Sequence, residues 1–324
     1  MTYSIRFGVG LPYFSNESFA PIAEAAILAE KLGFDSLWMP DHGYLPWEAL
    51  ATLSAIAAKT KDIKLGTCVL DVNRRNPATL AQMTSTLDVI SGGRLILGIG
   101  SGNPGVNPYG FPLDKPVTRM RESIEIMERL WTESSVDFTG KFYRFEKASI
   151  GAKPVQRPHP PIWIAAFGPV MRKIAGEIGD GFITQNIPPT IFEEELSSVR
   201  NCAMTASRDP SQIQPVLASL PVSVSRDYAT ARRNIEPIAR SWLTRTTVSR
   251  FAQRLGFAAP WTRPDDVPAE AIERCFIFGT PRECVAKIEE YVEAGVRYFI
   301  ALRILPPGAD SLELFSNEVV SHFK

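Results

Sequence analysis

The chain alternates short apolar runs with longer amphipathic stretches, and this alternation restricts its fold more than any other feature. Runs such as 63–70 and 94–99 have the length of buried strands, whereas 78–90 and 117–132 carry apolar residues at helical spacing. Strand, helix and strand in this order form right-handed crossovers in a parallel sheet. The sequence therefore predicts an α/β fold with parallel strands.

Eight such strands can be placed along the chain, with helices between most of them. The predicted strands are 5–11, 36–39, 63–70, 94–99, 162–166, 181–185, 214–224 and 298–304. The predicted helices are 17–32, 48–59, 78–90, 117–132, 170–178, 191–206, 228–255, 281–294 and 311–323. No linker divides the chain, so we expect one (β/α)8 TIM-barrel domain over residues 1–324. A doubly wound sheet has the same alternation and stays open on pattern alone.

Two segments do not fit the strand and helix rhythm. Residues 133–160 lack a helical period and contain several aromatic residues and prolines, which indicates an insertion with room for a β-hairpin. Residues 258–269 form a proline-rich loop. We expect both to be additions to the barrel.

Charge and cysteine content exclude several classes of protein. Lys and Arg number 35, as do Asp and Glu, so we expect no nucleic-acid partner and no attraction to an anionic membrane. No signal peptide or membrane-spanning run is apparent, and the four cysteines show no C-x-x-C spacing, which favours reduced thiols in a cytoplasmic protein. The three histidines are isolated in sequence, so no metal site is expected.

A glycine-rich segment, 100–105, follows the fourth predicted strand and matches the dinucleotide fingerprint G-x-G-x-x-G. That fingerprint requires a helix to begin at the glycines. Here Pro104, Pro108 and Pro112 prevent a regular helix until after Pro116. We interpret these glycines as letting the backbone approach a ligand, and not as a Rossmann site.

The same region carries a long and specific string. Residues 86–102, TLDVISGGRLILGIGSG, resemble the luciferase-like monooxygenase superfamily. Residues 34–42 (FDSLWMPDH), 164–169 (IAAFGP), 175–181 (AGEIGDG) and 278–285 (FGTPRECV) resemble further parts of that family in matching order. The resemblance covers almost the whole chain, is weakest over 186–270, and implies a single TIM barrel that binds a flavin or deazaflavin.

Within that superfamily, residues 65–69 (LGTCV) and 75–77 (RNP) resemble the deazaflavin branch, which includes the methylene-tetrahydromethanopterin reductases. This likeness implies coenzyme F420 as cofactor, hydride transfer to or from a small-molecule substrate, and a homodimer formed through the early helices. It also implies a cis peptide bond between Cys68 and Val69. An FMN-dependent monooxygenase and a non-catalytic flavin-binding barrel remain alternatives.

The candidate site residues follow the ends of predicted strands, where a TIM barrel binds its ligands. Asp41 and His42 are the candidate catalytic residues, because a histidine transfers protons near neutral pH and the carboxylate can orient it. Their plainer interpretation is that Asp41 caps a turn and His42 fills a gap. The candidate cofactor-binding residues are Asp41, Cys68, Val69, Gly102, Asn103, Ala165, Ala166, Gly168 and Pro169.

Some of these residues have specific expected roles. Gly168 and Pro169 open a helix whose free N–H groups can bind phosphate. Cys68 is expected to pack beneath the ring and not to act as a nucleophile. Arg74 and Arg75 either bind an acidic cofactor tail or are simply exposed.

Asn103 departs from one subgroup of the family. The sugar-phosphate dehydrogenases carry an acidic glutamate just after the glycines of the fourth strand, where this chain has Asn103. An asparagine cannot supply a proton at neutral pH, so a sugar-phosphate substrate is disfavoured. Trp38 and Trp163 are expected in the core, and Trp47 is a candidate for the pocket wall.

Overall fold

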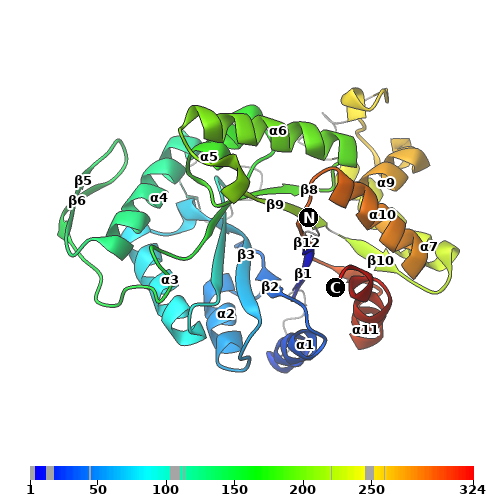
Figure 1. Ribbon diagram of the computed structural model, residues 1–324, viewed down its shortest axis with the longest axis horizontal. Helices are drawn as coiled ribbons and strands as arrows, with labels where there is room; N and C mark the ends of the chain where they lie inside the picture. Colours follow the sequence, from blue (N-terminus) through cyan, green and yellow to red (C-terminus); the bar gives the residue numbers. More distant parts are fainter. Residues whose placement is uncertain are drawn as a thin grey trace.

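A computed structural model of the chain describes residues 4–11, 18–43, 45–102, 110–111, 114–219, 221–244, 252–258 and 260–324. Eight parallel strands close into a barrel in the order β1-β12-β9-β8-β7-β4-β3-β2 (Figure 1). They are β1 (Arg6–Gly10), β2 (Ser36–Met39), β3 (Lys64–Asp71), β4 (Leu95–Gly100), β7 (Ile162–Ala165), β8 (Gly181–Gln185), β9 (Gln214–Ser219) and β12 (Tyr298–Ala301). The predicted TIM barrel is confirmed, and because β1 pairs with both β2 and β12 the sheet has no open edge.

Helices surround the barrel (Figure 1). They are α1 (Ala20–Lys31), α2 (Ala49–Ala57), α3 (Pro77–Ser91), α4 (Pro116–Thr132), α5 (Pro169–Ile178), α6 (Pro189–Thr205), α10 (Pro281–Glu293) and α11 (Ala309–Glu318). Among the described residues, no helix combines the length and the apolar character needed to cross a membrane.

The additions to the barrel lie where the helical period is lost. The 133–160 insertion contains the antiparallel hairpin of β5 (Val136–Thr139) and β6 (Arg144–Ala148), which projects beyond α4 in Figure 1. The proline-rich loop includes a short 3-10 turn, η3 (Pro264–Asp266), and leads into α9 (Ala269–Cys275). Helix α7 (Tyr228–Leu243) ends earlier than the predicted 228–255 stretch, of which 245–251 lies outside the described residues.

Two predicted strands were wrong in extent. Each of 214–224 and 298–304 contains a barrel strand and then a second strand, β10 (Val222–Val224) and β13 (Ile304–Leu305) respectively. These second strands form a separate parallel sheet with β11 (Ile277–Gly279), which the sequence analysis did not predict. The described side chains of β9, β10 and β12 are almost all buried, so both stretches are mostly apolar and each resembles one long strand despite Pro221 and Arg303.

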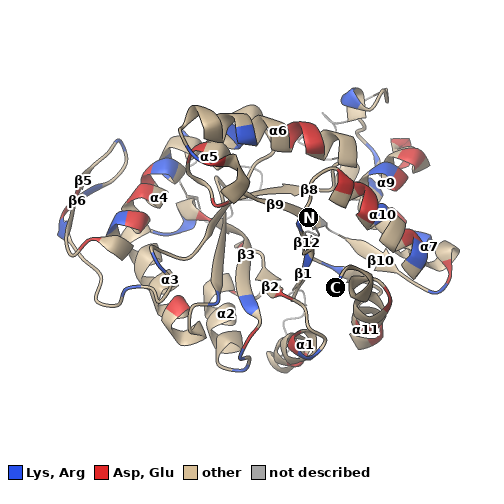
Figure 2. Cartoon of the chain, in the orientation of Figure 1, with Lys and Arg blue, Asp and Glu red and all other residues tan. Residues whose placement is uncertain are grey.

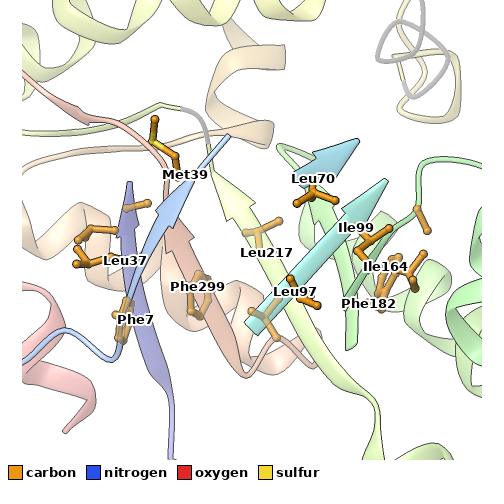
Figure 3. Close-up of a cluster of buried hydrophobic side chains, with 14 of the residues drawn as sticks. Phe7, Leu37, Met39, Leu70, Leu97, Ile99, Ile164, Phe182, Leu217 and Phe299 are labelled. Atoms are coloured by element: carbon orange, nitrogen blue, oxygen red, sulfur yellow. The ribbon is translucent and has the colours of Figure 1, made fainter. Parts of the chain in front are cut away.

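Alternate residues of the barrel strands point outward to the helices and inward to the barrel. Phe7, Leu37 and Phe299 belong to the large outer core, part of which is shown in Figure 3. Their sequence neighbours Trp38 and Tyr298 belong to a smaller cluster that also contains Trp163. This alternation is the two-residue period of a strand buried on both faces.

Three aromatic side chains fill the barrel interior. The rings of Trp38 and Trp163 stack with centroids 5.3 Å apart, and the edge of Tyr298 meets both. The Ser36 hydroxyl accepts hydrogen bonds from Trp38 Nε1 at 2.5 Å and from the Tyr298 hydroxyl at 2.7 Å. The expectation that both tryptophans belong to the core is confirmed.

Glycines on the neighbouring strands make room for these rings. Gly66 pairs with Trp38 and Gly181 with Trp163, and Gly8 lies on the other side of Trp38. A Cβ atom at Gly66 would lie 2.3 Å from the Trp38 ring, and one at Gly181 would lie 2.5 Å from Trp163. Each bulky side chain is therefore accommodated by the absence of a side chain on the adjacent strand.

A buried ion pair joins two helices of the outer layer. Arg172 on α5 donates from Nη1 to Glu195 Oε1 on α6 at 2.9 Å, and Arg254 Nη1 lies 3.7 Å from the same oxygen. Glu195 is 2% exposed, and its Oε2 has no hydrogen-bond partner in the described structure. Burial raises the pKa of Glu195 from 4.5 to about 7, although the two arginines oppose the shift.

We predict that Glu195 makes stability fall as the pH rises. Between pH 4.5 and about 7 the folded protein holds the Glu195 proton more tightly than the unfolded chain, so the free energy of unfolding decreases through that window. On going from pH 5 to pH 8 the wild type should lose roughly 2–3 kcal/mol relative to Glu195→Gln, at about 1.4 kcal/mol per pKa unit.

Urea unfolding at several pH values measures this difference. Glu193→Gln is the matched control, because Glu193 is an exposed glutamate on the same helix α6 and does not contribute to the shift of the Glu195 pKa. Equal pH slopes for Glu195→Gln and the wild type would contradict the prediction.

Candidate active site

The predicted site residues that the structure describes gather at the C-terminal ends of four adjacent strands. Asp41 and His42 follow β2, Cys68 and Val69 lie in β3, Gly102 follows β4, and Ala165 ends β7, with Ala166, Gly168 and Pro169 behind it. Strands β2, β3, β4 and β7 are neighbours in the barrel. Asn103 lies outside the described residues. In TIM barrels this end carries the ligand.

Asp41 is a buried carboxylate held by two consecutive arginines. It is 2% exposed, and its Oδ2 accepts from Arg75 Nη1 at 2.7 Å and its Oδ1 from Arg75 Nη2 at 3.0 Å. Arg74 donates to Oδ1, and the backbone N–H of Asp71 donates to Oδ2 at 3.2 Å. Both carboxylate oxygens are therefore engaged by protein donors. This arrangement suits an anchor for the segment after β3 better than a group that exchanges protons.

Glu48 extends this cluster to the next helix. Arg75 also donates to Glu48 Oε1, while Glu48 Oε2 caps α2 by accepting from the Ala51 N–H at 2.6 Å. The side chains of Arg74 and Arg75 are only 16% and 11% exposed, so the interpretation of two solvated arginines is wrong. Two guanidinium groups face two carboxylates, and the cluster carries no net charge.

A second polar cluster joins the ends of β3 and β4. Asp71 Oδ1 accepts from the Asn73 N–H at 2.9 Å and from Asn73 Nδ2 at 3.1 Å, and Nδ2 also donates to the Ser101 carbonyl at 2.8 Å. Gly102 has φ +84°, and a Cβ atom there would lie 2.9 Å from the Asp71 carboxylate. Only a glycine fits this close approach, as the sequence analysis expected for the segment.

Asp71, Asn73 and Glu48 are not among the predicted site residues. Asp71-Val72-Asn73 directly after a strand is a sequence in which an aspartate accepts the backbone N–H two residues on, and this signal could have marked the turn. Glu48 gives only the weaker signal of an acidic residue at a helix start.

The bond between Cys68 and Val69 is a cis peptide, as the family resemblance implied. The register between β3 and β4 shifts over this stretch, between Thr67 and Leu70. Cys68 is 4% exposed, and burial raises the pKa of its thiol to about 12. The thiol therefore stays protonated at neutral pH, consistent with packing and not with nucleophilic chemistry.

The N-terminus of α5 is open. Gly168 is its N-cap, no side chain caps the helix, and Pro169 occupies the first turn. Among the described residues, no atom lies within 4 Å of a Cβ placed on Gly168, and Phe167 and Val170 are exposed beside it. The first N–H groups of this ten-residue helix can thus receive an anion from outside the chain.

The fold agrees with the comparisons with known proteins. Residues 2–298 match the luciferase-like monooxygenase family, and the chain belongs to that family. It is similar to the F420-dependent glucose-6-phosphate dehydrogenase of Amycolatopsis mediterranei, with 33% identity over 94% of this chain and 96% of the relative.

Two further relatives are reductases. The chain is 30% identical to the 5,10-methylenetetrahydromethanopterin reductase of Archaeoglobus fulgidus, over the full length of both proteins. The solved structure of the coenzyme F420 dependent tetrahydromethanopterin reductase of Methanopyrus kandleri superposes with a TM-score of 0.87 and 26% identity, over 99% of this chain and 100% of that one.

We predict that Asp41→Asn destabilises the fold. The substitution leaves Arg74 and Arg75 largely buried with only Glu48 to compensate them, and breaking a buried ion pair costs about 3–5 kcal/mol. Urea unfolding should therefore show a loss of about 3 kcal/mol or more. Glu146→Gln removes an ion pair with Arg144 in which both side chains are exposed, and it is the control, with an expected loss below about 1 kcal/mol. Equal losses in the two variants would contradict a structural role for the buried cluster.

Proposed function

We propose that this protein is a coenzyme F420-dependent oxidoreductase that transfers a hydride to or from a small organic substrate. The observation that carries the proposal is that two relatives matched over nearly their full length, a glucose-6-phosphate dehydrogenase and a tetrahydromethanopterin reductase, both depend on F420. Because these relatives differ in substrate but not in cofactor, the cofactor is the property that we carry over to this chain. Fold alone would not support the step, because TIM barrels host many chemistries.

The residues present fit such a cofactor. Among the described residues, the buried amide oxygen Asn73 Oδ1 has no hydrogen-bond partner, and the absence of a side chain at Gly102 lets the segment after β4 approach Asp71 and Asn73 closely. Cys68 and Val69, Ala165 and Ala166 would contact the ring from β3 and β7, and the open N-terminus at Gly168 and Pro169 would bind the acidic tail. A bound deazaflavin supplies the carbon that accepts or donates the hydride.

The protein must hold the substrate and manage a proton. We assign the proton to His42, because Asp41 is occupied by Arg74 and Arg75 and the Cys68 thiol stays protonated. Asp41 is instead a positioning residue. Since Asn103 stands where the sugar-phosphate dehydrogenases have an acid, we propose a substrate other than a sugar phosphate.

We further propose a cytoplasmic homodimer that associates through its early helices. Helix α2 contains no charged residue, and the one charge of α3, Asp88, is buried. Figure 2 shows mostly uncharged residues along these helices, and Val89 and Ile90 are nearly half exposed. An uncharged surface with exposed aliphatic residues suits a contact between identical subunits.

Light scattering on the purified protein should give twice the chain mass. Ile90→Glu should shift the particle toward the monomer by placing a charge in the contact. Met204→Glu, on an equally exposed residue of α6, is the control and should leave the mass unchanged. A monomeric wild type would contradict the dimer proposal without touching the cofactor proposal.

A cofactor titration tests the proposed activity. We expect F420 to bind at least tenfold more tightly than FMN, measured by fluorescence and by free ligand after dialysis. Preference for FMN would favour a monooxygenase, and binding of neither would contradict the site. Glucose 6-phosphate added to the F420 complex should leave the deazaflavin absorbance unchanged.

One variant tests whether the N-terminus of α5 binds the cofactor. Gly168→Asp places a carboxylate at the open helix N-terminus, where the space is free and the backbone is extended, so the fold should tolerate it. The carboxylate would compete with the anionic tail, and F420 affinity should fall at least tenfold. Gly151→Asp, also in open space, is the control and should bind F420 like the wild type.

A further inference from the structure

Asn73 has an amide whose orientation is fixed by its neighbours. The residue is 9% exposed and lies in the short turn η1 (Val72–Arg74) after β3. Its Nδ2 donates to Asp71 Oδ1 at 3.1 Å and to the Ser101 carbonyl at 2.8 Å. Both partners are acceptors, so the nitrogen must face them and the oxygen must face away.

That oxygen is a buried acceptor without a donor. Asn73 Oδ1 has no hydrogen-bond partner in the described structure, although the rest of the side chain is fully engaged. Buried polar atoms are normally paired, because an unpaired one loses its hydration without compensation. An unpaired atom at a ligand-binding edge therefore indicates a partner that arrives with the ligand.

The neighbouring protein donors are already committed. Arg74 and Arg75 bind the carboxylates of Asp41 and Glu48, and the Asn73 N–H itself binds Asp71. Gly102 lies against the same amide, with a Cβ position 3.0 Å from Asn73 Nδ2, and presents no side chain there. Asn73 therefore presents a rigid acceptor in the turn that follows β3, at the end of the barrel where the predicted site residues lie.

We propose that Asn73 is a further ligand-binding residue, whose Oδ1 accepts a hydrogen bond from an N–H or O–H group of the deazaflavin bound at the ends of β3 and β4. This inference rests on the proposed function and deepens it. Two groups of such a cofactor share this chemistry, namely the imide N–H of the ring and the hydroxyls of its side chain. A donor is required in either case, so a ligand that offers only acceptors here would be rejected.

Two variants isolate the acceptor from the rest of the amide. Asn73→Leu removes the oxygen together with both internal hydrogen bonds. The exchange Asp71→Asn with Asn73→Asp keeps the internal hydrogen bond with its direction reversed and leaves a carboxylate oxygen in place of the amide oxygen. Both variants lose the donation to Ser101, but they differ both in the hydrogen bond between residues 71 and 73 and in the acceptor for the ligand. Asp71→Leu removes that hydrogen bond and keeps the Asn73 oxygen, so it reports the effect of the internal bond alone.

We expect F420 to bind Asn73→Leu about tenfold more weakly than the wild type, and the exchanged pair within about threefold of it. A deazaflavin methylated at the imide nitrogen distinguishes the two donors. If the ring N–H is bound, methylation weakens binding to the wild type but not to Asn73→Leu. If a side-chain hydroxyl is bound, methylation has the same effect on both proteins. Asn317→Leu, on an exposed residue of α11, is the control, and thermal melting verifies folding.

Two outcomes would overturn the role of Asn73. Unchanged F420 binding by Asn73→Leu would show that the oxygen has no ligand partner. Equal weakening in Asn73→Leu and in the exchanged pair would show that only the Ser101 contact matters. Failure of the wild type to bind F420 would instead contradict the proposed function, so the two failures are distinguishable.

Discussion

The structure depends on how the interior of a closed eight-stranded barrel is filled. Such a barrel is a packed core and not a pore, so its inward side chains must match the available volume. Here Trp38, Trp163 and Tyr298 occupy part of this interior, and glycines on adjacent strands leave room for the tryptophan rings. The aromatic cluster packs against the inner face of the strands that carry the site residues. Cys68 belongs to the same cluster.

The site above this core is held together mainly by charge. Asp41 ties the end of β2 to the segment after β3, Arg75 continues to the start of α2, and Asn73 joins β3 to β4. Because guanidinium and carboxylate groups balance, the cluster can be largely buried without a net charge. A rim fixed in this way suits hydride transfer, which depends on the distance and orientation of two carbon atoms and not on a mobile protein nucleophile.

The barrel could be predicted because it follows from local pattern. The sequence alternates buried strands with helical stretches, and few topologies accommodate this alternation. The family resemblance favoured the closed barrel among them. The splitting of 214–224 and 298–304 could not be predicted, because hydrophobicity reports burial and not the sheet in which a strand is buried. The ends of β10 and β13 are set by pairing with β11, from a distant part of the chain.

The candidate site was predicted residue by residue but not as a network. Asp41 and Gly102 were placed at the correct strand ends, whereas the attachment of Asp41 to Arg74 and Arg75 joins residues more than thirty positions apart. No local sequence pattern predicts an ion pair between residues so far apart in the chain. Asn73 was not predicted as a site residue because asparagine is common in turns. Its proposed role depends on one side-chain oxygen, and only the folded structure shows that this oxygen has no hydrogen-bond partner among the described residues.

The pairing of tryptophan with glycine across neighbouring strands limits how this barrel can diverge. A side chain cannot be gained at Gly66 while Trp38 keeps its ring, nor at Gly181 while Trp163 keeps its own. The two residues of each pair can change only together, because a larger side chain on one strand requires a smaller one on the neighbouring strand. The inner wall of the barrel should therefore evolve by exchanges within pairs, while the loops above it change one residue at a time.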